Sequence, residues 1–107
     1  MKKTVYQINS FQEIDKISDK PAFTLPLSSH LYYGLEYIVS GLDLYPDLNN
    51  KFFINIGDHF VMCFEICNTK IRNVITSTMP HQNILTMLEK FNINHYLDTD
   101  LSINDDF

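Results

Sequence analysis

The sequence predicts a two-layer α+β domain, in which a mostly antiparallel sheet of about three to five strands carries helices on one face. The densest apolar stretch, residues 52–68 (FFINIGDHFVMCFEICN), consists of two runs separated by Gly57-Asp58-His59, a pattern typical of a β-hairpin. Elsewhere, runs rich in β-branched and aromatic residues alternate with segments of helical periodicity. The length of 107 residues predicts a single domain over residues 1–97, followed by an acidic tail over residues 98–107.

The chain begins with the patterns of a strand and a short helix. Residues 4–8 (TVYQI) have the β-branched and aromatic composition of a strand. Ser10 and Glu13 form an S-x-x-E capping box, in which each side chain caps the backbone N–H of the other residue. We therefore expect a helix over 10–18.

An extended segment and a long helix follow. Residues 22–27 (AFTLPL) predict an edge strand or a loop, because Pro26 cannot donate to a strand ladder. An apolar stripe then predicts a helix over 29–44. Gly34 and Gly41 lie in its interior, where glycine costs about 1 kcal/mol, so we expect another element to approach closely. Packing against the protein's own sheet is favoured over a dimer seam.

The second half continues with a strand, a helix and a strand. Residues 71–78 (IRNVITST) are rich in β-branched residues and predict a third antiparallel strand. A helix is expected over 80–91, ended by Asn92 in a left-handed conformation. Residues 93–97 (INHYL) predict a short edge strand.

Two loop lengths compete in the expected hairpin. A two-residue loop, Gly57-Asp58, suits a type II′ turn, whereas a three-residue loop that includes His59 places more large apolar residues together. Burying a large apolar side chain is worth about 1.5–3 kcal/mol, so we expect the longer loop. One face would then carry Phe52, Ile54, Ile56, Phe60, Met62, Phe64 and Ile66, and the other Phe53, Asn55, Val61, Cys63, Glu65 and Cys67.

The charge distribution disfavours direct binding to nucleic acid. The formal net charge is −5, and the eight basic residues are scattered along the chain without a cationic stripe for a phosphate backbone. A protein partner with a basic surface is electrostatically favoured instead. No apolar run has the length of a membrane span, so a membrane partner is not expected.

Cys63 and Cys67 are the only cysteines. On a strand they would lie about 13 Å apart at about 3.3 Å per residue, beyond the span of a disulfide, which is about 7 Å between Cα atoms. Reduced thiols predict a cytoplasmic location.

The candidate chemical motifs are weak, so no metal, other cofactor or catalytic residue is expected. The cysteines, His81 and His95 have a C-x3-C-x13-H-x13-H spacing that differs from the paired ligands of zinc knuckles. A catalytic thiol would need an electropositive environment, which the expected strand lacks. The tail repeats only the first half of a calcium loop, with Ile103 at the glycine position.

These observations predict a non-enzymatic protein-binding module, such as an inhibitor, an immunity-type protein or a chaperone-like adaptor. Homodimerisation through the uncovered sheet face or its edge is a companion expectation, because a one-sided sheet leaves apolar area to hide. Two groups of residues supply the expected contacts. The first is the tyrosines that lie outside the apolar stripe of the helix, and the second belongs to the turn and the semi-apolar face of the hairpin. They are Tyr33, Tyr37, Phe53, Asp58, Cys63 and Glu65.

Two alternatives remain open. The protein could be an acidic mimic of nucleic acid that occupies a basic groove of a target protein through Asp98, Asp100, Asp105 and Asp106. It could also be a small-molecule-binding protein or enzyme that uses Cys63 and Cys67 with histidines.

Overall fold

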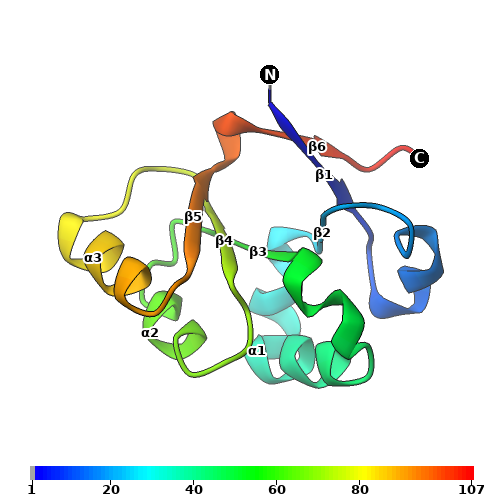
Figure 1. Ribbon diagram of the computed structural model, residues 1–107, viewed down its shortest axis with the longest axis horizontal. Helices are drawn as coiled ribbons and strands as arrows, with labels where there is room; N and C mark the ends of the chain where they lie inside the picture. Colours follow the sequence, from blue (N-terminus) through cyan, green and yellow to red (C-terminus); the bar gives the residue numbers. More distant parts are fainter. Residues whose placement is uncertain (1) are drawn as a thin grey trace.

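In residues 2–107, which the computed structural model describes apart from the side chains of residues 28–33, six parallel strands form one curled sheet, a half-barrel (Figure 1). Their order across the sheet is β5-β4-β3-β2-β1-β6, so the first and last strands are neighbours. The strands are β1 (Lys3–Gln7), β2 (Phe23–Thr24), β3 (Phe52–Gly57), β4 (Asn73–Thr76), β5 (Asn94–Leu97) and β6 (Leu101–Asn104).

Helical segments make the connections between these strands. Three are α-helices, α1 (Leu27–Asp43), α2 (Met62–Ile66) and α3 (Gln82–Lys90). Three are short 3-10 helices, η1 (Phe11–Lys16), η2 (Pro46–Lys51) and η3 (Asp98–Asp100). No helix in the described residues is both long enough and apolar enough to cross a membrane.

The prediction of a mostly antiparallel sheet of three to five strands is wrong, because all the strand pairs are parallel and six strands take part. Parallel neighbours need a crossover of a dozen or more residues. Residues 58–72, with α2, supply that crossover between β3 and β4. The strand expected over 22–27 is β2, which lies inside the sheet between β1 and β3 and not at an edge.

The predicted hairpin is also wrong in its second half. Phe52–Gly57 is a strand, but the residues after His59 turn into α2. The helix buries Cys63 and Ile66 at its inner side and leaves Phe64 56% exposed, so Phe64 does not share a face with the apolar residues of β3. An i, i+3 spacing of buried residues is helical and differs from the i, i+2 spacing of a strand.

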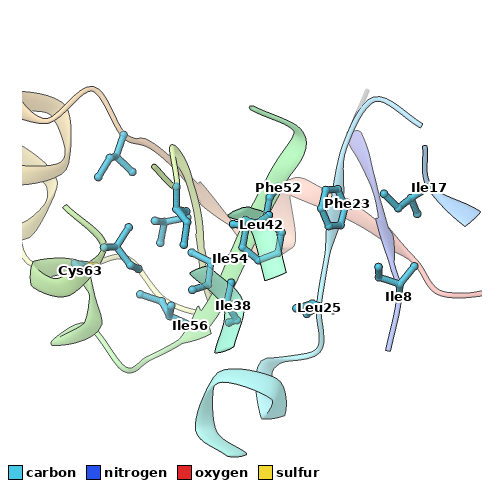
Figure 2. Close-up of a cluster of buried hydrophobic side chains, with 14 of the residues drawn as sticks. Ile8, Ile17, Phe23, Leu25, Ile38, Leu42, Phe52, Ile54, Ile56 and Cys63 are labelled. Atoms are coloured by element: carbon cyan, nitrogen blue, oxygen red, sulfur yellow. The ribbon is translucent and has the colours of Figure 1, made fainter. Parts of the chain in front are cut away.

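The helices pack on one face of the sheet, where the main core lies. Figure 2 shows residues of that core from several elements, including Phe23 of β2, Ile38 of α1, and Phe52 and Ile54 of β3. All four side chains are at most 1% exposed. This cluster of buried side chains therefore joins the crossover helices to the inner strands.

The second face of the sheet is buried without a helix. Its cluster consists of Val5, Ala22, Phe53, Ile75 and Leu101, of which the most exposed is Leu101 at 5%. Tyr96 and Ile103 pack against this cluster. The curl of the sheet brings these residues together, so this apolar face is covered within the chain. The homodimer through a sheet face or edge stays a prediction.

The two glycines of the long helix have different roles. A Cβ atom at Gly41 would overlap the ring of Phe11, so η1 approaches the helix closely at this point. The close approach is made by the protein itself, as expected, but by η1 and not by the sheet. Gly34 has φ +82° and interrupts the helical geometry of α1, and a Cβ there would meet nothing within 4 Å.

Local signals at the ends of helices are confirmed more closely. Asn92 has φ +60°, and its N–H donates to the carbonyl of Glu89 while the N–H of Ile93 donates to the carbonyl of Leu88. These are the two hydrogen bonds of a Schellman motif. At the start of η1 the same two side chains cap the helix as expected, but each accepts from another N–H than a capping box requires. Ser10 Oγ accepts from Gln12 and not from Glu13, and Glu13 accepts from Asn9 at 2.7 Å and not from Ser10.

Candidate functional site: an acidic groove between α1 and α2

A groove of about 570 Å³ lies between α1 and the segment that contains α2. Its volume is within the usual range for ligand sites, about 300–1,000 Å³. One wall comes from the second part of α1, after the kink at Gly34, and the other from Glu65 and Thr69. From α1 the groove is lined by Gly34, Leu35, Glu36, Val39 and Ser40.

A helix kink on one wall and a hydrogen-bonded turn on the other position these side chains. The kink at Gly34 restarts the helix, and Leu35 and Val39 are then one turn apart on its half-buried side. Thr69 closes the turn after α2, because its hydroxyl donates to the carbonyl of Ile66 at 2.7 Å and accepts from the N–H of Ile71 at 3.1 Å. The groove thus has a half-buried apolar part between two structured walls.

Both charged residues among the described lining residues of the groove are carboxylates. Glu36 and Glu65 are exposed, and no lysine, arginine or histidine is found among these described residues. The described residues hold two ion pairs, Lys16–Glu13 and His59–Asp58, and neither involves Glu36 or Glu65. The nearby Arg72 directs Nη1 to backbone carbonyls, at 2.9 Å from Thr69 and 2.8 Å from Ile71.

Exposed apolar side chains lie on α2 beside the groove. Phe64, which precedes Glu65, is 56% exposed, and Val61 at the start of the helix is 72% exposed. Because α2 buries Cys63 and Ile66 on its inner side, Phe64 and Glu65 are on its outer side. Aromatic residues are enriched at protein-binding surfaces, so the exposed Phe64 favours this function.

The structure separates the six contact residues expected from the sequence. Glu65 is in the groove, and Asp58 is exposed on the loop after β3, 3.9 Å from Nε2 of His59. Phe53 and Cys63 are 3% and 0% exposed, and they offer no contact surface. Half-buried Tyr37 packs on the Phe11 ring at 5.8 Å between centroids, and the side chain of Tyr33 is outside the described residues.

The cysteines lie on a helical segment and not on a strand, which corrects the distance argument. Residues four apart on a helix are neighbours, and the N–H of Cys67 donates to the carbonyl of Cys63 at 3.2 Å. Both thiols are free. Burial, together with the nearby Cys67, raises the pKa of Cys63 to about 11, and burial also raises the pKa of Cys67, although Arg72 opposes this. Neither environment favours a reactive thiolate.

The histidines of the suggested zinc spacing have separate partners. Nδ1 of His81 accepts from the N–H of Asn83 at 3.2 Å at the start of α3, and His95 on β5 pairs with Thr76. Among the described residues no three His, Cys, Asp or Glu side chains gather where they could share a metal ion.

The acidic tail is divided by a strand. Asp98 and Asp100 lie in η3, and Asp105 and Asp106 follow β6, which pairs with β1. A strand of the length of β6 spans about 13 Å at about 3.3 Å per residue, so the carboxylates form two pairs and not one row.

Sequence reasoning missed Gly34 and Glu36 as site residues. The signal was a glycine in the middle of a predicted helix, which was interpreted as a place of close packing. A positive φ at Gly34 interrupts the helix there and places Glu36 in the first turn of its second part.

No family model matches the chain, and neither the curated proteins nor the solved structures contain a significant match to it.

Proposed function

We propose that this protein is a non-enzymatic protein-binding module, of the inhibitor, immunity or adaptor type, whose α1–α2 groove receives a segment of a partner protein that carries both basic and apolar side chains. The observation that carries the proposal is that Glu36 and Glu65 line the groove without a cation among the described residues. The net charge of −5 supports attraction of a basic partner over a longer range.

The apolar part of the segment would contact the half-buried side chains of the groove and the outer side of α2. Leu35 and Val39 supply the first contact, and Phe64, 56% exposed, supplies the second. Covering an exposed aromatic contributes to binding at about 25 cal/mol per Å² of apolar area. The carboxylates then select lysine or arginine over acidic residues.

The free thiols of Cys63 and Cys67 favour a reducing compartment for this module, and we propose the cytoplasm.

Binding of two model peptides tests the proposal. A short peptide that alternates lysine and leucine is expected to bind, and its glutamate–leucine counterpart is not. The Glu36→Gln/Glu65→Gln variant is expected to bind the basic peptide about three- to thirtyfold more weakly, since an exposed ion pair is worth about 0.3–1 kcal/mol. Isothermal titration calorimetry at low and high salt measures both effects.

A matched control uses carboxylates outside the groove. Asp15→Asn/Asp106→Asn removes the same formal charge from η1 and the C-terminal segment, at two exposed residues. If this control weakens binding as much as the groove variant, the attraction is due to net charge alone and the groove is not the binding site. Equal binding of the acidic and basic peptides would also contradict the proposal.

A further inference from the structure

A second pocket, of about 470 Å³, lies between α3 and β5. Leu85, Leu88 and Ile93 form its apolar part, while Glu89 and His95 are its titratable residues. Asn92 and Asn94 complete the lining. The pocket contains none of the residues of the α1–α2 groove, so it is independent of the proposed function.

A chain of hydrogen bonds fixes the tautomer of His95. The hydroxyl of Thr76 donates to the carbonyl of Thr78 at 2.8 Å. The same oxygen lies 2.7 Å from Nε2 of His95. Because the only hydroxyl proton of Thr76 is directed to a carbonyl, Nε2 of His95 must be the donor in this contact. In the neutral ring the proton is therefore on Nε2, and Nδ1 is an acceptor.

The titratable groups of the pocket are thus both acceptors. His95 has Nδ1 as its remaining acceptor, and Glu89 has an exposed carboxylate on α3. No lysine or arginine is among the described residues that line the pocket. A carboxylate and a neutral imidazole next to leucine and isoleucine side chains match a ligand that has a charged N–H donor and a short apolar group.

We propose that the α3–β5 pocket binds a small organic ammonium ion, with the N–H groups donating to the Glu89 carboxylate and to Nδ1 of His95, and with the alkyl part against Leu85 and Leu88. The Thr76 hydroxyl acts as a positioning group, because it keeps the proton of His95 on Nε2. Thr76 is 0% exposed and does not itself reach the ligand.

Protonation of His95 opposes this binding, since an imidazolium has no acceptor and repels an ammonium ion. Burial lowers the pKa of His95, and the charge of Asp100 in η3 acts in the opposite direction. Asp100 from η3 is the charged group that acts on the ring, Thr76 on β4 is its uncharged partner, and Glu89 lines the same pocket from α3. Binding is therefore expected at neutral pH and lost as His95 becomes protonated.

Titrations with three probes of similar size test the proposal by ¹H–¹⁵N NMR of the full chain. Butylammonium is expected to cause saturable shifts at Leu85, Glu89 and His95, while butanol and butyrate cause none. The Glu89→Gln variant is expected to bind butylammonium about tenfold more weakly, since it loses the charged acceptor and retains only a neutral amide oxygen. Long-range ¹H–¹⁵N correlations of the His95 ring report its tautomer and its protonation.

Two further variants separate positioning from direct contact. Thr76→Val leaves both acceptors in place but removes the partner of Nε2, so it is expected to mix the two tautomers of His95 and weaken binding. Asp15→Asn, at an exposed residue of η1 outside both pockets, makes the same change of charge as Glu89→Gln and should have no effect. The proposal is overturned if butanol binds as well as butylammonium, if Glu89→Gln binds normally, or if the shifts occur only at the α1–α2 groove. Because Glu89 is exposed, its variant tests the proposal even if Thr76→Val fails to fold.

Discussion

The side-chain amide of Asn94 donates to the side-chain oxygen of Asn73 at 3.1 Å, across the neighbouring strands β4 and β5. In turn, Nδ2 of Asn73 donates to the carbonyls of Asn50 and Phe52, at 3.3 and 3.2 Å. Carbonyls only accept, so the orientation of both amides is determined. One buried asparagine therefore ties three consecutive parallel strands together where they begin.

Replacing this asparagine should destabilise the protein more than replacing its partner. Asn73→Leu leaves buried polar groups without partners, and we expect the free energy of unfolding to fall by about 1–3 kcal/mol. Asn94→Ala, at an exposed residue, should cost about 0.5–1.5 kcal/mol. Urea denaturation followed by circular dichroism measures both values. A larger loss for Asn94→Ala than for Asn73→Leu would contradict this role of Asn73.

A second prediction concerns the contact between α1 and η1. Gly41→Ala places a methyl group against the Phe11 ring, and we expect a loss of about 1–3 kcal/mol in the free energy of unfolding from overpacking. Phe11→Ala removes that ring, so the double variant should lose less than the sum of the two single losses. Denaturation of the four proteins of this cycle gives the coupling energy. Strict additivity would show that the ring and the glycine are not in close contact.

The buried thiol of Cys63 makes stability depend on alkaline pH. Burial raises its pKa from 9.0 to about 11, so the folded state retains the proton at a pH at which the unfolded state releases it. The contribution of Cys63 to stability is therefore complete below pH 9 and is lost as the pH rises to about 11.

The difference between the wild type and Cys63→Ala isolates this effect from the titration of tyrosines and lysines. We expect the wild type to lose more stability than Cys63→Ala between pH 9 and about 11 in thermal denaturation. In the folded wild type at neutral pH, alkylation by iodoacetamide should be slower at Cys63, which is 0% exposed, than at the half-buried Cys67. The same pH profile for both proteins would refute the assigned pKa.

Some elements are predictable from the sequence because their signals are local. The α3 helix and its end at Asn92 depend on helical periodicity and on a residue that tolerates positive φ. The composition of β1, β4 and β5 is also local. The strands β4 and β5 lie within the expected segments, and β1 begins and ends one residue earlier than expected. Strand direction is not local, since it depends on which segments meet in the folded sheet.

The apolar stretch after β3 shows why the architecture was mispredicted. Short apolar runs fit both a buried strand and a buried helix, and Val61 and Phe64 have strand propensity although they are 72% and 56% exposed here. The nearly continuous burial of β3, on both faces of the sheet, is typical of parallel strands. The run of Phe52, Phe53 and Ile54 therefore carried a signal for a parallel sheet.

The site was only partly predictable for a similar reason. The net charge of the chain predicts an acidic binding surface, and Glu65 is among the contact residues expected from the sequence. Glu65 and Glu36 line the same groove, however, because of the crossover helix α2 and the kink at Gly34. A hairpin in place of α2 would not bring these two carboxylates to one groove.

The location of peptide binding tests the central claim most directly. In ¹H–¹⁵N NMR of the full chain titrated with the lysine–leucine peptide, the largest shifts are expected in residues 34–40 and 64–69. In Glu36→Gln/Glu65→Gln these shifts should need about a three- to thirtyfold higher peptide concentration, and in Asp15→Asn/Asp106→Asn they should be unchanged. Shifts concentrated in residues 98–106 would contradict the groove as the binding site and favour the acidic C-terminal segment, and the absence of any saturable shift would contradict binding of a basic partner.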